Sequence, residues 1–116
     1  MIKKSGSYNV AINEKMKDGN GVVEIHHLFE GEEFGGCGRV FGVFYIKPGD
    51  SIGYHKHEGE QEAYYILEGE ANYNDNGTEV ILKAGDMALC KDGESHGIAA
   101  VGDKTLAYIA LITYTK

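Results

Sequence analysis

The stretch that decides the fold is residues 49–69, which read GDSIGYHKHEGEQEAYYILEG. In it His55 and His57 stand two positions apart, so on a strand both imidazoles point to the same face, about 7 Å apart along the chain. Glu62 follows five residues later and opens the apolar run 63–67, which a loop allows to return beside the first strand. These residues predict two neighbouring strands that bring two imidazoles and one carboxylate together.

A third imidazole stands further along the chain. His96 follows the turn-like run DGES at 92–95 and leads into an apolar strand at 98–101. Three imidazoles and one carboxylate offer nitrogen and oxygen donors that suit Fe(II), Mn(II), Ni(II), Cu(II) or Zn(II), with coordination positions left open for water or a substrate. The pattern therefore favours a transition-metal site.

Strand-like runs recur along the rest of the chain between glycine-rich turns. The 17 glycines and single proline, without any sustained helical spacing of apolar residues, favour short strands over long helices. Pro48-Gly49 predicts a type II turn, and Asn76-Gly77 predicts a tight hairpin. The predicted strands are 21–29, 39–46, 51–57, 62–68, 70–73, 78–83, 86–90, 95–101 and 105–114. An all-β sandwich or barrel is expected.

Length and composition limit the organisation and the partners. A chain of 116 residues corresponds to one domain, expected at 21–116 after a polar segment at 1–20 that contains a short strand. The net charge is −7 and there is one arginine, which argues against nucleic-acid binding. No apolar run approaches the ~20 residues that span a membrane. Two cysteines in unlike contexts, with no secretory pattern at the N-terminus, lead us to expect a cytoplasmic protein with free thiols.

The two histidine-containing segments resemble the two motifs of the cupin superfamily. Residues 49–69 match the first motif, G(X)5HXH(X)3,4E(X)6G, at every fixed position. Residues 85–100 resemble the second, G(X)5PXG(X)2H(X)3N, with Lys91 where proline is usual and Ala100 where asparagine is usual. The resemblance, which is to small single-domain bacterial cupins, implies a double-stranded β-helix, or jelly-roll, barrel. It also implies that one divalent transition metal per chain (Fe, Mn, Ni, Zn or Cu) is ligated by His55, His57, Glu62 and His96.

Other polar residues near these motifs have weaker assignments. Glu58 and Glu60 stand in an acidic loop, and we expect both to be solvated. His26 and His27 alternate on one predicted strand, so at most one points inward, and a surface or interface histidine is the commoner outcome. Arg39 is the only arginine and could hold a substrate carboxylate, although a surface charge is more common at the start of a strand.

Several candidates remain for the lining of a substrate pocket. Tyr64 and Ile66 share the parity of Glu62, which predicts that both face the barrel interior, where an aromatic residue is usually part of the core. Cys90 stands on the strand before His96 and is by default a small buried hydrophobe. The candidates are therefore Tyr64, Ile66, Arg39, His27 and Cys90.

Three functions fit these features. The first is a metal-dependent dioxygenase, lyase or isomerase that acts on a small keto, enediol, carboxylate or sugar-like molecule. The second is a non-catalytic module that binds a sugar or carboxylate, and the third is a barrel whose metal is only structural. Oxalate-degrading cupins are expected to be the least similar, because they carry an arginine just before the first histidine where this chain has Ile52, Gly53 and Tyr54. Since imidazoles must be neutral to bind a metal, metal loss is expected below about pH 6.

Two predicted strands indicate self-association. Residues 40–46 and 106–112 are apolar on both faces, whereas a barrel of this size has only one interior. The outer face of at least one of these strands should therefore be covered, and we expect a homodimer.

Overall fold

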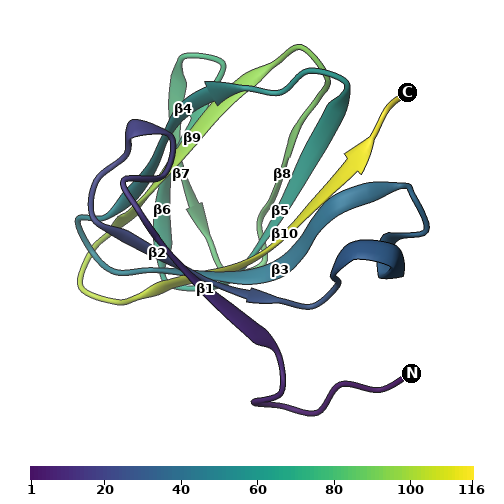
Figure 1. Ribbon diagram of the computed structural model, residues 1–116. Coiled ribbons are helices and arrows are strands. Elements are labelled where there is room, and N and C mark those ends of the chain that lie inside the picture. Colours follow the sequence, from purple (N-terminus) through teal and green to yellow (C-terminus); the bar gives the residue numbers. More distant parts are fainter.

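The computed structural model describes residues 1–116, which form two antiparallel sheets facing each other (Figure 1). The elements are β1 (Asn9–Glu14), η1 (Met16–Asp18), β2 (Val22–His27), η2 (Gly31–Phe34), β3 (Gly38–Ile46), β4 (Ser51–Lys56), β5 (Glu60–Glu68), β6 (Glu70–Asp75), β7 (Thr78–Lys83), β8 (Met87–Cys90), β9 (Ser95–Val101) and β10 (Leu106–Tyr114). One sheet has the order β1-β2-β3-β10-β5-β8, and the other has the order β4-β9-β6-β7. The expected all-β jelly-roll architecture is confirmed.

The strands lie where the hydrophobic pattern predicts them, and only their ends differ. β1 runs on to Glu14, because Glu14 pairs with Val22 across the first hairpin. β5 begins at Glu60, since Glu60 pairs with Tyr114 of β10. Pairing across the sheet thus extends strands into polar residues that the pattern assigns to loops. None of the helices has the length and apolar composition needed to cross a membrane.

Both predicted turns have the backbone geometry that their residues favour. Gly49 has φ 90°, and the N–H of Asp50 donates to the carbonyl of Lys47 at 2.9 Å, as expected for a type II turn. Asn76 and Gly77 join β6 to β7 with φ of 52° and 100°. Both values lie in the left-handed region that a type I′ hairpin requires.

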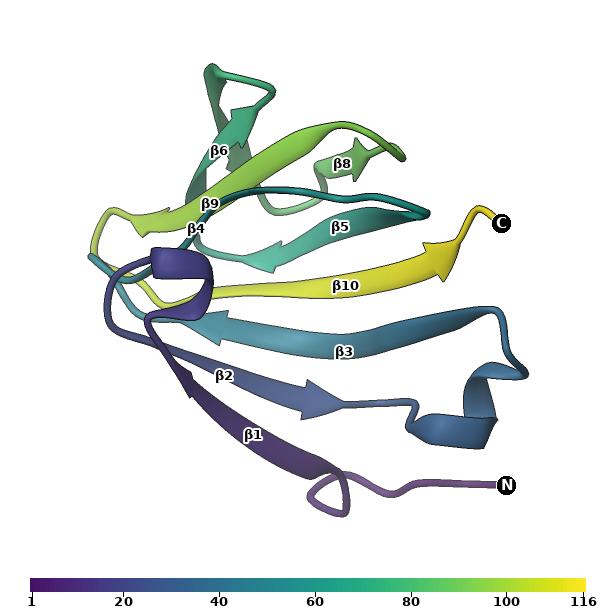
Figure 2. The same ribbon diagram turned by 45° about the horizontal axis from the view of Figure 1, so that its top comes forward.

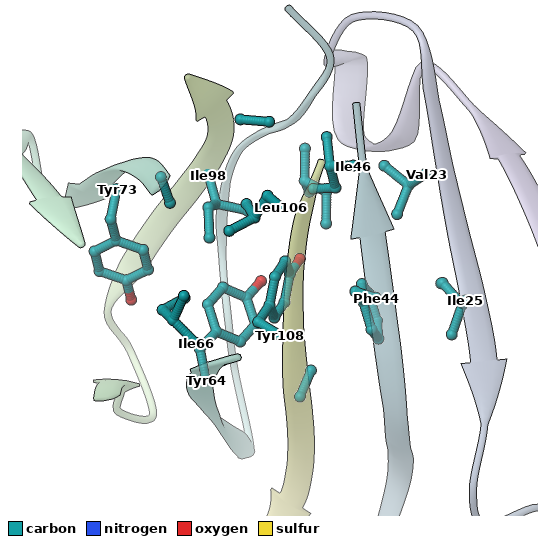
Figure 3. Packing of buried hydrophobic residues seen from close by; sticks show 14 residues of the cluster. Val23, Ile25, Phe44, Ile46, Tyr64, Ile66, Tyr73, Ile98, Leu106 and Tyr108 are labelled. Atoms are coloured by element: carbon teal, nitrogen blue, oxygen red, sulfur yellow. The ribbon is translucent and has the colours of Figure 1, made fainter. Parts of the chain in front are cut away.

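Aliphatic and aromatic side chains fill the interior between the sheets (Figure 3). Tyr64 and Tyr108 stand side by side with ring centroids 4.5 Å apart, and Phe44 stacks on Tyr108 at 5.2 Å. The strands that carry the predicted ligands also contribute to this core, with Ile52 in β4, Tyr64 in β5 and Ile98 in β9. The predicted ligand residues lie nearer the other ends of these three strands, so the core and the polar cluster share one interior.

The six-stranded sheet presents an apolar row on the side that faces away from the core. Strand pairing aligns Val10, His26, Val43, Ile109, Tyr65 and Met87 across its six strands. In each strand at least one neighbour of the aligned residue belongs to the core or packs against it, so the alternation of side chains along a strand turns this row outward. Val10, Tyr65 and Met87 are 50%, 48% and 60% exposed. We define the outer face as this row together with the apolar residues of the same parity, Ile12, Leu67, Leu89 and Leu111.

Candidate metal centre

Three strands carry the four predicted ligands to one point between the sheets. His55 lies near the end of β4 and His57 directly follows that strand, while Glu62 lies in β5 and His96 in β9. One donor atom from each residue lies within 4.8 Å of the others. The three imidazole rings are nearly equidistant, with centroids 4.8–4.9 Å apart. The structure therefore gathers all four residues into one cluster.

The distances between the donor atoms suit a shared metal ion. Nε2 of His57 lies 3.0 Å from Nε2 of His96, and Oε1 of Glu62 lies 3.2 and 3.0 Å from these two nitrogens. Atoms bound to one ion at about 2.1 Å lie about 3.0–3.4 Å apart, depending on the angle between the bonds. His57, Glu62 and His96 are at most 4% exposed, and His55 is half-buried. The residues present fit a divalent transition metal with nitrogen and oxygen ligands.

A β-bulge in β4 turns His55 towards the other three residues. Ile52 pairs with Ile98 and His55 pairs with His96, so two residues of β4 stand opposite one residue of β9. In a regular strand Ile52 and His55, which are three residues apart, would point to opposite faces of the sheet, and the bulge brings them to the same face. The Nδ1–H of His55 donates to the carbonyl of Gly53 at 2.7 Å. Because a carbonyl only accepts, this bond leaves Nε2 of His55 unprotonated and available to a metal.

Glu60 fixes the second imidazole and corrects our expectation that it is solvated. Its carboxylate accepts hydrogen bonds from Nδ1 of His57 at 2.6 Å and from Nε and Nη2 of Arg39 at 2.7 and 2.8 Å. The expectation is wrong because Glu60 belongs to β5 and shares the inward parity of Glu62. Glu58, as expected, is exposed, with a side chain 74% accessible. A carboxylate on Nδ1 orients the His57 ring and leaves Nε2 directed at the cluster.

Two tyrosines hold the third imidazole. The hydroxyl of Tyr73 lies 2.9 Å from Nδ1 of His96, and the Tyr64 ring stacks on His96 with centroids 5.1 Å apart and planes 23° apart. Burial raises the pKa of Tyr73, so its hydroxyl stays neutral and can accept the Nδ1 proton. Sequence reasoning missed Tyr73, because its contact with His96 depends on the pairing of β6 with β9.

Replacing Glu60 with glutamine is expected to weaken metal binding by about 10- to 100-fold, the usual effect of losing an outer hydrogen-bond partner of a metal-binding histidine. The neutral amide no longer favours the Nδ1 proton on His57, and it loses the charge that attracts Arg39. Titration of metal against a competing chelator measures the change. Glu58→Gln, an exposed carboxylate two residues away, is the matched control and should leave the affinity unchanged. An equal loss in both variants would mean that only the general acidity of the loop matters.

The cluster perturbs the pKa of three of its members. Burial alone would raise the pKa of Glu62, but hydrogen bonds from His57 and His96 outweigh it and lower the value to about 2. The pKa of His57 is raised, chiefly by its hydrogen bond to Glu62. Burial lowers the pKa of His55. In the metal-free protein His57 and Glu62 therefore favour an imidazolium–carboxylate pair.

The pairing of His57 with Glu62 is expected to contribute most to the stability of the metal-free protein between about pH 4.5 and pH 6.5. The lowered pKa of Glu62 stabilises the fold above the unfolded value of 4.5, and this contribution is lost as the pH falls towards 2. The raised pKa of His57 stabilises the fold below the unfolded value of 6.5, and this contribution is lost as the pH rises through the raised value. Thermal denaturation from about pH 3 to about pH 9 measures the profile. Glu62→Gln should flatten both flanks, and an identical profile in that variant would contradict the assignment.

Three of the clustered residues, His55, His57 and Glu62, line a cavity of about 180 Å³. Two of the pocket candidates, Arg39 and Tyr64, line it as well. The remaining wall is mainly apolar and consists of Met16, Lys17, Ile25, Val40, Phe44, Ile52 and Ile112. The cavity therefore combines a polar end at the cluster with apolar sides.

The other pocket candidates do not line this cavity, although Cys90 pairs with Glu62 between β8 and β5 and so lies beside the cluster. Ile66 is fully buried in the core, because two further residues of strand carry it past Tyr64 and away from the cluster. His27 is half-buried at the end of β2. Cys90 is buried at the end of β8, and burial raises its thiol pKa to about 12, so it packs as a neutral side chain. His26 points outward, where it contacts Glu24 at 2.7 Å and packs on the Tyr45 ring.

Comparisons with known proteins agree with this architecture. The family model for the cupin domain matches residues 42–112. The oxalate-binding protein of Thermotoga maritima is 41% identical over 112 residues, which cover 97% of this chain and 93% of that protein. The crystal structure of a predicted oxalate decarboxylase from Thermotoga maritima is 40% identical, with a TM-score of 0.94 over 98% of this chain and 99% of that one. The structure of KdgF from Halomonas sp. shares the fold, with a TM-score of 0.76 at 13% identity over 100% of this chain and 94% of that one.

These relatives do not support the expectation that oxalate-related cupins are the least similar group. That expectation rested on the absence of an arginine from positions 52–54, next to the first histidine. The structure offers a physical reason for the discrepancy, since Arg39 reaches the same cavity from β3. An arginine outside the histidine motif can thus place its guanidinium beside the cluster.

Proposed function

Since the chain belongs to the cupin family, we propose that it holds one divalent transition metal through His55, His57, Glu62 and His96 and uses it to bind a small carboxylate, for which oxalate is the first candidate. One observation carries the proposal: four buried or half-buried donors converge next to a small cavity that also contains Arg39. Such a metal supplies a Lewis acid with open positions for carboxylate oxygens. Iron, manganese, nickel, zinc and copper all suit this donor set.

The size of the cavity favours a very small ligand. Its volume is about 180 Å³, and an apolar protein cavity of about 150 Å³ accommodates benzene. A molecule of about six to eight non-hydrogen atoms therefore fits, a range that includes oxalate and excludes most sugars. The apolar side chains cover part of the bound carboxylate, and a cation that is partly open to solvent can still attract it across the cavity.

Arg39 supplies that cation. Its Nε and Nη2 are held by Glu60, which fixes the plane of the guanidinium and leaves the Nη1 hydrogens and one Nη2 hydrogen for a ligand. Binding rather than catalysis is favoured, because Glu60 is occupied by two partners and Glu62 belongs to the metal cluster. Glu62 is the only carboxylate that lines the cavity.

Calorimetric titration with oxalate tests this function. Protein loaded with Mn(II), Ni(II) or Zn(II) should bind oxalate, and metal-free protein should not. Arg39→Gln should weaken binding by about 10- to 100-fold, consistent with the loss of a charge-assisted hydrogen bond. Lys56→Gln removes an exposed cation near the histidines that does not line the cavity, so it is the control and should bind normally. Equal oxalate binding with and without metal would refute the proposal.

We also propose that the protein partner is a second copy of this chain, packed on the outer face. Six strands span about 24 Å, and strands of this length give a face on the order of the ~800 Å² that each subunit buries in a stable interface. Val43, Ile109 and Tyr65 lie at the centre of the aligned row without a charged residue between them. An apolar centre with polar residues towards the edge is the usual composition of a homodimer interface.

A further inference from the structure

The β1–β2 connection is an unusual element of this barrel that the proposed function does not explain. Lys15, Lys17 and Asp18 have φ of 49°, 54° and 62°, in the left-handed region that residues other than glycine rarely adopt. Each such residue costs roughly 1 kcal/mol or more, and the conformation persists only where surrounding contacts determine it. Backbone strain of this kind gathers at ligand sites.

Close backbone contacts hold the connection against β4. A Cβ on Gly53 would lie 1.9 Å from the carbonyl oxygen of Lys17, and one on Gly19 would lie 2.3 Å from the carbonyl oxygen of Ser51. The N–H of Ser51 also donates to the carbonyl of Asn20 at 2.8 Å. Only glycine permits these approaches, so the connection is docked in one position rather than lying loosely over the sheet.

The docked connection spans a gap between the sheets. β4 is an edge strand and has no hydrogen bonds to the six-stranded sheet. Figure 2 shows η1 beside β4, between that strand and the six-stranded sheet. Met16 of η1 packs against the core and lines the same cavity as Ile52 and His55. Met16 and Lys17 of this connection thus line the cavity on the side where β4 has no pairing to the six-stranded sheet, and Met16 is the apolar one of the two.

We propose that Met16 determines the size of the ligand, an inference that rests on the proposed function. The strained connection fixes its backbone, and the length of the thioether side chain limits how far a ligand can extend from the metal cluster. A shorter side chain at this position lengthens the cavity towards the gap, and a bulkier one shortens it. Met16 is therefore a specificity-determining residue that is not itself one of the proposed metal ligands.

The test is calorimetric titration of metal-loaded protein with oxalate, malonate and succinate, together with the metal content. Met16→Ala should raise the affinity for succinate relative to oxalate by about 10-fold or more, the usual effect of changing pocket length by a methylene or two. Met16→Phe should weaken binding of all three ligands while metal content stays unchanged. Met87→Ala, an exposed methionine on β8, is the matched control and should keep the wild-type order. If Met16→Ala does not fold, Met16→Val provides the same test.

The outcomes separate the two proposals. Wild-type protein that binds oxalate, with the same oxalate-to-succinate ratio in Met16→Ala, overturns the role of Met16 and leaves the proposed function standing. Absence of metal-dependent binding of all three ligands in the wild type and in Met16→Ala overturns both. A ratio that shifts in opposite directions in the alanine and phenylalanine variants supports Met16 as the size limit.

Discussion

Purified protein in which His96 is replaced by alanine is expected to contain no bound metal, whereas the wild type takes up about one equivalent. His96 is the most buried donor of the cluster, and its Nε2 lies within about 3 Å of both His57 and Glu62. Its removal leaves three donors around an opened space, which lowers affinity far more than the loss of an outer hydrogen bond. Elemental analysis after reconstitution measures the difference directly.

Stability provides a second measurement of the same site. Metal present at 100 times its dissociation constant should stabilise the wild type by about 2.7 kcal/mol and leave the His96→Ala variant unaffected. His26→Ala is the matched control, because His26 points outward and contacts Glu24 instead of the cluster. Glu62→Gln preserves side-chain volume and therefore tests the same site even if the alanine variant misfolds. Full metal content in both cluster variants would place the metal elsewhere in the protein.

The sequence predicted which four residues form the cluster, but not the backbone bulge and the side chains that hold them in place. Spacing in the motifs indicates His55, His57, Glu62 and His96, because strand alternation fixes which residues can share a face. It does not reveal that Ile52 and His55 point the same way, since this depends on a bulge in the pairing of β4 with β9. One sign of the bulge was available in the sequence: Ile52 and His55 are both expected to point inward although they are three residues apart, and Gly53 lies between them.

The residues from distant parts of the chain that hold the cluster or line its cavity could not be predicted from the sequence for a different reason. We expected Glu60 in a solvated loop because the predicted strand began at residue 62. In the structure β5 begins at Glu60, because pairing with the C-terminal strand β10 extends it. Tyr73 and Met16 lie in segments whose own sequences give no sign of the cavity. Their positions follow from how β6 pairs with β9 and how η1 docks on Gly53. Local patterns predict local structure, whereas these contacts are set by tertiary packing.

The second large effect expected is the conversion of a dimer into a monomer by a single charge on the outer face. Ile109 lies at the centre of the aligned row, between Val43 of β3 and Tyr65 of β5. A glutamate there would be buried opposite apolar side chains of the second copy without a counter-ion, which costs several kcal/mol. Ile109→Glu should therefore raise the dimer dissociation constant by more than about 100-fold.

Sedimentation equilibrium at micromolar concentration should give twice the chain mass of 12.7 kDa for the wild type and the single-chain mass for Ile109→Glu. Ile81→Glu is the control, because Ile81 is likewise an isoleucine on a strand but belongs to the four-stranded sheet; it is 51% accessible, whereas Ile109 is half-buried. It should remain dimeric. If the wild type is monomeric, or if Ile81→Glu dissociates the dimer while Ile109→Glu does not, the outer face is not the interface. Metal content should be the same in all three proteins, since the cluster lies between the sheets and the outer face points away from it.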